Sequence, residues 1–253
     1  MSGRPYDQYA AIYDRTGQGD FSRKMWSRVR AQAERLGFRG QTVLDLAGGT
    51  GAAAVDMIQD GYRVVVADLS RAMLLQARDQ GEAAGLRTVA SDMRHLPFAA
   101  GSFDLVTSFY DSLNYLLTSD DLAATLHGVA HALRAGGLFA FDLNTPFTLK
   151  EHWVGLCHAR AEAARASIWE ATWLGPAAIS RLRATFFVRS DDGRWDRFDE
   201  THDEHGFSGD EIVEASRAAG LAVVHAEDLH SGRRPGRLSR RVFYVLRREE
   251  VVR

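Results

Sequence analysis

The most informative stretch of this sequence is Val43-Leu44-Asp45-Leu46-Ala47-Gly48-Gly49-Thr50-Gly51. Its first half is an apolar run typical of a buried strand, and it leads directly into a glycine-rich turn followed by helix-forming alanines. Glycines in such a turn allow backbone N–H groups to approach a ligand with no side chain in the way. We therefore expect a strand, a turn and a helix, with a nucleotide-like ligand at the turn.

Strand-like and helix-like segments alternate after this turn. The apolar runs that resemble strands cover residues 42–47, 62–68, 86–91, 103–109 and 138–143. Between the last two, Leu122, Leu126, Val129 and Leu133 recur at helical spacing. A capping box at residues 118–121 predicts where this helix begins, and Gly136-Gly137 predicts its end. Such alternation is typical of an α/β fold with a mostly parallel sheet and helices on both faces.

The segments outside these repeats predict additions to the sheet. Residues 6–14 and 21–37 resemble two helices that belong to no repeat, and residues 168–174, 181–190 and 195–205 resemble three antiparallel strands. After a second capping box at Ser208, a helix to Gly220 and strands near 221–226 and 241–246 complete a seven-stranded Rossmann-like sheet. We expect an N-terminal helical lid (1–40), a cofactor-binding core (41–145), an antiparallel cap over the substrate (146–207) and the C-terminal part of the sheet (208–253).

Composition narrows the class of protein. The chain has 253 residues, a formal net charge of −2 and a single cysteine, Cys157. This charge gives no field that would attract nucleic acid or an anionic membrane, so a small molecule is the expected partner. No signal peptide or membrane-spanning run is apparent, and we expect a cytoplasmic enzyme. The lone cysteine excludes an internal disulfide, and no metal is expected.

Two carboxylates indicate which ligand the turn binds. Asp68 ends the second strand, where it can accept hydrogen bonds from both hydroxyls of a ribose. The dinucleotide fingerprint is also satisfied, by residues 49–54, so an NAD(P)-dependent oxidoreductase is an alternative. Asp45 favours a cofactor with ammonium and sulfonium groups, because a pyrophosphate gains nothing from a negative charge there. A buried acid satisfied by backbone amides is the other interpretation of Asp45. The chain also lacks the Tyr-x-x-x-Lys pair of many such oxidoreductases.

Asp45 to Gly51 resembles the first motif of the class I S-adenosylmethionine-dependent methyltransferases, an acid followed by a glycine-rich turn. Asp92-Met93, residues 103–106 and residues 133–137 match later motifs of that family. The resemblance implies that Gly49 and Gly51 line the methionine part of the cofactor, that Asp68 holds the ribose and that Asp92 and Met93 lie beside the adenine. The complete set of residues expected to bind S-adenosylmethionine, with S-adenosylhomocysteine as product, is Tyr13, Asp45, Ala47, Gly48, Gly49, Gly51, Asp68, Leu69, Ser91, Asp92, Met93 and Phe109.

Tyr110-Asp111-Ser112-Leu113-Asn114-Tyr115-Leu116, the early tyrosines and the antiparallel insertion resemble a small-molecule subgroup that includes bacterial amino-sugar N-methyltransferases. This resemblance implies methyl transfer to a nitrogen or oxygen by in-line displacement, for which alignment and exclusion of water matter most. The expected catalytic residues are Tyr13, Tyr110, Asp111, Asn114 and His205. A non-methylating descendant of the fold is a further alternative.

Several of these residues also have a purely structural interpretation. The tyrosines can pack, and Asp111 can cap a turn. Strand alternation places His202 with Glu200 on one face and His205 with Asp203 on the other. One of these His–carboxylate pairs could be a general base, but solvated edge residues are the favoured interpretation of all four. The arginines between 233 and 241 suggest a solvated basic loop, or a site for a substrate carboxylate or phosphate. Trp169, Trp173 and Phe187 could line a pocket or form a homodimer surface.

Overall fold

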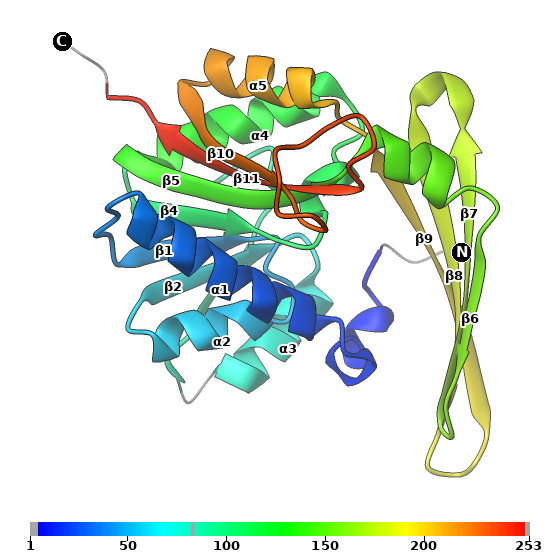
Figure 1. Cartoon of the computed structure of the whole chain (residues 1–253). Coiled ribbons are helices and arrows are strands. Elements are labelled where there is room, and N and C mark those ends of the chain that lie inside the picture. Colours follow the sequence, from blue (N-terminus) through cyan, green and yellow to red (C-terminus); the bar gives the residue numbers. More distant parts are fainter. Residues whose placement is uncertain (1–4, 82–83, 251–253) are drawn as a thin grey trace.

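The computed structural model describes residues 5–81 and 84–250, and its centre is a seven-stranded sheet (Figure 1). The strand order is β10-β11-β5-β4-β1-β2-β3. All neighbours are parallel except β11, which runs antiparallel to both β5 and β10. The strands are β1 (Thr42–Leu46), β2 (Arg63–Asp68), β3 (Arg87–Ala90), β4 (Phe103–Ser108), β5 (Leu133–Asn144), β10 (Leu221–Asp228) and β11 (Arg241–Arg248). The predicted Rossmann-like fold is confirmed.

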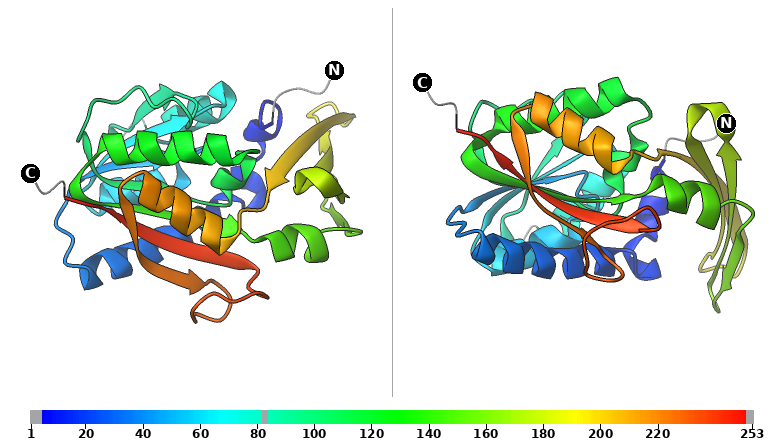
Figure 2. Two further views of the ribbon diagram at one scale, coloured as in Figure 1. Left: turned by 90° about the horizontal axis from the view of Figure 1, so that it is seen from above. Right: turned by 45° about the horizontal axis from the view of Figure 1, so that its top comes forward.

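Helices cover both faces of this sheet, as Figures 1 and 2 show. Helices α1 (Gly19–Arg35), α2 (Ala52–Gln59) and α3 (Arg71–Gly81) pack with one face, and α4 (Ser119–Ala132) and α5 (Gly209–Ala218) with the other. Strand alternation divides the apolar side chains between two cores: Val43 faces the first group of helices and Leu44 the second. No helix in the described ranges combines the length and apolar character needed to cross a membrane.

A second sheet stands beyond the carboxyl ends of the central strands (Figure 1). Its four antiparallel strands are β6 (Cys157–Ala161), β7 (Arg165–Leu174), β8 (Ile179–Arg189) and β9 (Trp195–His205). The face turned toward the main sheet carries Ala184 and Phe186, which pack with Tyr9 and Ile12 of the N-terminal segment. The N-terminal segment, defined here as residues 5–18, therefore lies between the two sheets.

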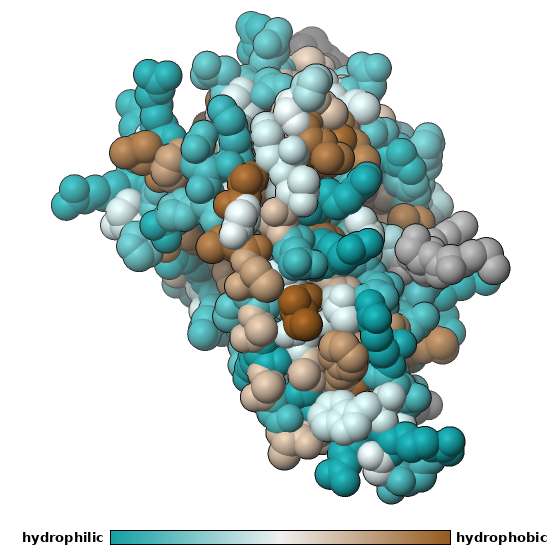
Figure 3. All heavy atoms as spheres, turned by 90° about the vertical axis from the view of Figure 1, so that its right-hand side faces the viewer, coloured by the Kyte–Doolittle hydropathy of each residue, from teal (hydrophilic) through white to brown (hydrophobic). Residues whose placement is uncertain are grey.

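The opposite face of the second sheet is mostly hydrophilic, with scattered apolar side chains (Figure 3). Ion pairs between Arg181 and Asp203 and between Arg197 and Asp199 lie on it, beside the partly exposed Ile168. Strand register separates the aromatic residues considered for a pocket or a dimer. Trp169 and Trp173 share the inner face, whereas Phe187 lies on the outer face.

Three local predictions are wrong. Residues 6–14 do not form an α-helix, because Tyr6 has a left-handed φ of 68° and the backbone that follows closes into short 3-10 turns at Tyr9–Ala11 and Asp14–Thr16. Strand β6 was not expected, because all five of its residues are exposed and show no apolar alternation. Helix α4 ends at Ala132 and not at Gly136-Gly137, because Leu133 is already extended and pairs with Phe103. The short helical turns are η1 (Tyr9–Ala11), η2 (Asp14–Thr16), η4 (Ser112–Tyr115), η5 (Thr148–His152) and η6 (Gly175–Ala177).

Candidate active site

Two adjoining cavities lie at the carboxyl ends of β1, β2, β4 and β5, where open α/β sheets bind their ligands. The first, of about 620 Å³, lies over the glycine-rich turn, and we call it the cofactor cavity. The second, of about 320 Å³, lies between the main sheet, the N-terminal segment and the inner face of the four-stranded sheet. We call it the acceptor cavity.

The cofactor cavity is built on the turn that joins β1 to α2. Gly49 has a φ of 56°, a left-handed conformation that glycine adopts without strain. Its backbone N–H donates to Asp68 Oδ2 at 2.9 Å, and Ser70 N–H donates to Oδ1 at 2.8 Å. Burial raises the pKa of Asp68, although these N–H groups act in the opposite direction. The turn and the end of β2 are thereby held together at the cavity wall.

Ten of the twelve residues predicted to bind the cofactor line this cavity: Tyr13, Ala47, Gly48, Gly49, Asp68, Leu69, Ser91, Asp92, Met93 and Phe109. Their chemistry fits S-adenosylmethionine, since a carboxylate is available for a ribose and apolar side chains for a purine ring. The Asp92 carboxylate is also ion-paired with Arg94, which holds the pKa of Asp92 below its usual value.

Asp45 and Gly51 do not reach the cavity surface. The Asp45 carboxylate accepts a hydrogen bond from the Thr107 hydroxyl at 2.8 Å and lies directly beneath Gly48, where a Cβ would come within 2.5 Å of it. Burial raises the pKa of Asp45 to about 7. Gly51 precedes α2 with a φ of 73° and packs against Leu86. Asp45 and Gly51 therefore support the glycine-rich turn on the side that faces away from the cofactor cavity.

Four tyrosines line both cavities: Tyr6, Tyr13, Tyr110 and Tyr115. They come from the N-terminal segment and from the chain after β4. No other described residue lines both cavities. Tyr13 and Tyr110 were predicted as catalytic residues, and their positions are consistent with that role. Tyr6 and Tyr115 were noticed in the sequence only as packing or lid residues. These four rings form the shared wall between the cofactor and the acceptor.

The inner end of the acceptor cavity contains a buried charge cluster. Arg241 of β11 donates to Asp111 Oδ2 at 2.5 Å and to Asp142 Oδ2 at 3.0 Å. Asn144 donates to Asp111 and, at 3.2 Å, to Glu204 Oε2. Burial raises the pKa of Asp142 to about 6, against the effect of the Arg241 guanidinium. Two carboxyl groups, those of Asp111 and Asp142, therefore share one guanidinium.

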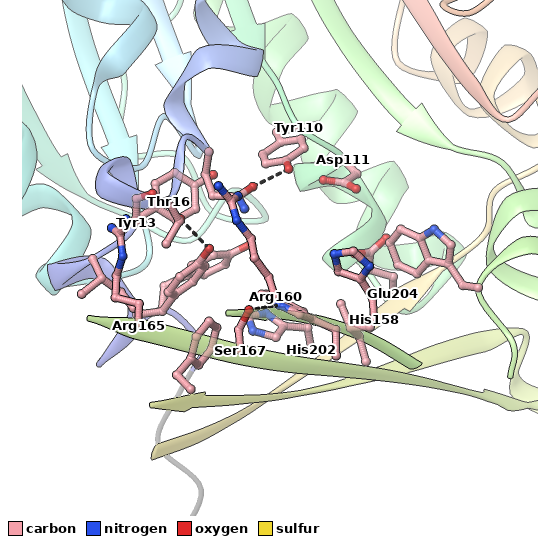
Figure 4. A pocket seen from close by; sticks show the side chains of 18 of the residues that line it. Tyr13, Thr16, Tyr110, Asp111, His158, Arg160, Arg165, Ser167, His202 and Glu204 are labelled. Carbon is pink, nitrogen blue, oxygen red and sulfur yellow. Dashed lines mark hydrogen bonds between the residues drawn. The ribbon is translucent and has the colours of Figure 1, made fainter. Parts of the chain in front are cut away.

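Figure 4 shows His202 and Glu204 on the four-stranded sheet, with Asp111 and Tyr110 across the cavity. Burial, followed by the charge of Asp111, raises the pKa of Glu204 well above its usual value. Among the described residues no arginine, lysine or histidine forms an ion pair with Glu204, which accepts the hydrogen bond from Asn144 at 3.2 Å. Sequence reasoning missed Glu204, although its spacing of two from His202 and four from Glu200 places all three on one face.

Two predicted catalytic residues lie away from both cavities. Asn114 is fully buried and braces the backbone, donating to the carbonyl groups of Asn144 and His205 at 3.0 and 2.8 Å. The His205 ring faces away from the acceptor cavity and packs on Phe207 with centroids 4.6 Å apart. We therefore withdraw both from the catalytic set. The favoured solvated interpretation of β9 is wrong for Glu200 and His202, which are each only 2% exposed.

The arginines of the predicted basic loop lie in two different environments. Arg241 belongs to the buried cluster, whereas Arg233, Arg234, Arg237 and Arg240 are exposed and line neither cavity. Sequence reasoning had no signal that separated Arg241 from its neighbours, because the distinction depends on its place in β11.

The N-terminal segment is attached to both sheets. On one side, the Glu200 carboxylate accepts backbone N–H groups of Tyr6, Gln8 and Tyr9 at 2.9, 3.1 and 3.0 Å. On the other, Asp14 accepts a hydrogen bond from Thr50 at 2.9 Å and another from Gln80. A single short segment therefore spans both cavities.

Comparisons with known proteins agree with this geometry. A methyltransferase-domain family model matches residues 43–137. A relative from Geobacillus sp. (strain WCH70), provisionally named a methyltransferase, is 29% identical over 96% of this chain and 99% of its own. The fold is similar to that of an S-adenosylmethionine-dependent methyltransferase from Clostridium acetobutylicum, with a TM-score of 0.85, 27% identity and coverage of 97% and 99%. Residues 43–137 thus match a methyltransferase domain, and the whole chain has the fold of S-adenosylmethionine-dependent methyltransferases.

The fold also resembles that of CalS10, an amino pentose methyltransferase from Micromonospora echinaspora solved with S-adenosylmethionine bound. The TM-score is 0.72, the identity is 24%, and the similarity covers 94% of this chain and 96% of CalS10. At this level of identity the similarity concerns the fold alone. The oxidoreductase alternative has no support in these comparisons, because the cofactor of the matched class is S-adenosylmethionine.

Proposed function

We propose that this enzyme transfers a methyl group from S-adenosylmethionine to a nitrogen or oxygen of a small molecule bound in the acceptor cavity. The observation that carries this proposal is the wall of four tyrosines common to both cavities. In-line displacement needs the acceptor atom opposite the sulfur, so the reaction must occur where the two cavities meet. A cavity of about 320 Å³ is suited to a small molecule.

When bound, S-adenosylmethionine supplies an activated methyl group on a positively charged sulfur. The tyrosine rings present electron-rich faces and hydroxyl oxygens that favour positive charge. The N-terminal segment covers the meeting point and excludes water, which strengthens electrostatic interactions there. Asp68 and the turn at Gly49 hold the cofactor, and the four tyrosines align the acceptor with it.

An amine is the acceptor that the buried charges favour. Glu204 and Asp111 face the acceptor cavity, where the Arg241 guanidinium pairs with Asp111 and Asp142. Arg160 and Arg165 also line the cavity, but both pair with Glu162. An ammonium group would supply the hydrogen bonds and positive charge that Glu204 lacks. The fold similarity to an amino pentose methyltransferase is consistent with this preference.

A methyl-transfer screen tests the proposal. The full chain is incubated with methyl-labelled S-adenosylmethionine and a panel of primary amines, amino sugars, phenols and a transfer RNA transcript, and labelled products are counted. We expect transfer to amines first, to hydroxyl compounds second and none to the RNA. Tyr110→Ala should lose transfer, whereas Tyr62→Ala, whose ring packs on Trp26 away from both cavities, should retain it. Cofactor binding without transfer to any small molecule would overturn the proposal.

A further inference from the structure

A chain of four side chains, two half-buried tyrosines followed by two buried residues, leads away from the shared tyrosine wall. The hydroxyl oxygens of Tyr6 and Tyr115 are 2.7 Å apart, and the Tyr115 hydroxyl lies 2.9 Å from His202 Nδ1. On the far side of the imidazole, Nε2 lies 3.4 Å from Glu200 Oε2. We propose that Tyr6, Tyr115, His202 and Glu200 form a relay that removes the proton released by the acceptor during methyl transfer.

The hydrogen bonds define the direction of this relay. Burial alone would raise the pKa of Glu200, but His202 and the backbone N–H groups of Tyr9 and Tyr6 outweigh it and hold this pKa below its usual value. Glu200 is therefore an anion, which favours the His202 tautomer with its proton on Nε2. Nδ1 is then free to accept the Tyr115 proton, and the Tyr115 oxygen accepts from Tyr6. A carboxylate that orients an imidazole, which in turn accepts a proton, is a recurring catalytic arrangement.

The hydroxyl groups of Tyr6 and Tyr115 transfer the proton along the relay without keeping it. Burial raises the pKa of both hydroxyls well above their usual value, so neither is stable as a phenolate. Each can still accept one proton while it passes on its own. His202 is the first group along the chain that can keep the proton, since an imidazole has two nitrogens and can become a cation.

The surroundings of His202 contain few other groups that exchange protons. On its own strand Glu200 and Glu204 share its face, η4 contributes Tyr115, and the N-terminal segment contributes Tyr6. From the neighbouring strands it faces Leu182 and the Trp169 ring, whose centroid is 6.3 Å away. His202 Nε2 is buried and, within the described residues, its contact with Glu200 Oε2 at 3.4 Å is an ion-pair contact and not a hydrogen bond. A positive charge on the ring would be stabilised by the Glu200 carboxylate beside it.

The step rests on the proposed function, and its atoms balance. An ammonium acceptor first loses one proton to solvent and reacts as the neutral amine. As a lone pair of that nitrogen, or of a hydroxyl oxygen, forms a bond to the methyl carbon, the carbon–sulfur bond breaks and its electron pair stays on sulfur. The proton of the acceptor atom passes to the Tyr6 oxygen, the Tyr6 proton to Tyr115 and the Tyr115 proton to His202 Nδ1. The imidazolium that results lies against Glu200, which is a positioning residue.

Nuclear magnetic resonance of the histidine-labelled full chain with S-adenosylhomocysteine tests the relay without any acceptor. We expect His202, assigned with His202→Gln, to carry its proton on Nε2. The Nδ1 signal should shift in Tyr115→Phe, which removes only a hydroxyl, and should stay unchanged in the control Tyr62→Phe. A proton on Nδ1, or no effect of Tyr115→Phe, would overturn the proposal.

Kinetics with a primary amine and a phenol from the screen provide the second test. We expect Tyr115→Phe to lower kcat about 10²-fold or more at neutral pH and to reduce the solvent isotope effect, with S-adenosylhomocysteine affinity unchanged. The loss should diminish at alkaline pH, where solution hydroxide deprotonates the acceptor. Full activity of Tyr115→Phe combined with an inactive Glu204→Gln would identify Glu204 as the base and exclude the relay. If wild-type protein transfers no methyl group, the proposed function fails, and the tautomer of His202 still tests the relay.

Discussion

Arg241 donates to Asp142 at 3.0 Å within the main sheet, with β11 supplying the cation and β5 the anion. Asp111 shares the same guanidinium, and Glu204 lies close by without a cation of its own. This cluster joins the last strand of the chain to the acceptor cavity. It couples the stability of the fold to the chemistry of the site.

Arg241→Met should destabilise the protein by about 3–5 kcal/mol, because it leaves buried carboxylates without their cation. Urea unfolding at pH 7 measures the loss. In the double variant Arg241→Met/Asp142→Asn, part of the stability should return, since one of the stranded charges is gone. Equal stability of wild type and Arg241→Met would show that the cluster is neutralised in some other way.

Asp45→Asn should change how stability depends on pH. The pKa of Asp45 is raised to about 7 in the folded protein, so between its unfolded value and 7 the folded state binds the extra proton. The contribution of Asp45 to stability is therefore present at low pH and lost as pH rises toward 7, at about 1.4 kcal/mol per unit. We expect Asp45→Asn to flatten this decline in urea titrations between about pH 4 and 7. Asp56→Asn, at a half-buried position on α2, should leave the decline unchanged.

Asp68→Ala should lower the affinity for S-adenosylhomocysteine about 10- to 100-fold, because hydrogen bonds to a charged group contribute about 1.5–3 kcal/mol each. Calorimetric titration measures this directly. The control is Asp56→Ala, which removes a carboxylate of α2 that pairs with Arg23 of α1. This variant should bind S-adenosylhomocysteine as wild type does. If Asp68→Ala bound S-adenosylhomocysteine as tightly as wild type, Asp68 would not be the residue that holds the ribose.

Glu200→Gln should loosen the N-terminal segment, since it replaces an anion that accepts three backbone N–H groups with a neutral amide. Hydrogen exchange of the amides of Tyr6, Gln8 and Tyr9 should become at least tenfold faster. Asp203→Asn is the matched control, because Asp203 lies on the same strand but pairs with Arg181 on the outer face. Unchanged protection in Glu200→Gln would mean that ring packing alone holds the segment.

The sequence predicts the parts of this enzyme that depend on local patterns. The turn at Gly49, the acid at Asp68 and the capping box at Ser208 each combine residue types whose local geometry is restricted, and the structure contains all three features. Strand β1 is apolar apart from Thr42 and Asp45, because both of its faces are buried. The parallel sheet and most of the cofactor cavity follow from these signals.

The acceptor cavity depends on long-range contacts that no local pattern reveals. Glu200 binds backbone groups more than 190 positions earlier in the chain, and this contact fixes the N-terminal segment on the four-stranded sheet. Glu204 lies in a run of charged residues that looks solvated until the sheet is folded against the core. His205 was selected over His202 for the same reason, since only the packing of β9 determines which of its faces is buried.

The two-sided attachment of the N-terminal segment has a consequence for turnover. Asp14 ties the segment to the glycine-rich turn through Thr50, while Glu200 ties it to the four-stranded sheet. S-adenosylhomocysteine cannot leave the cofactor cavity past the N-terminal segment unless that segment moves, and its movement also disturbs the acceptor cavity. We therefore expect intersecting initial-velocity patterns, with both ligands enclosed together, and departure of the products as the slowest event in each cycle.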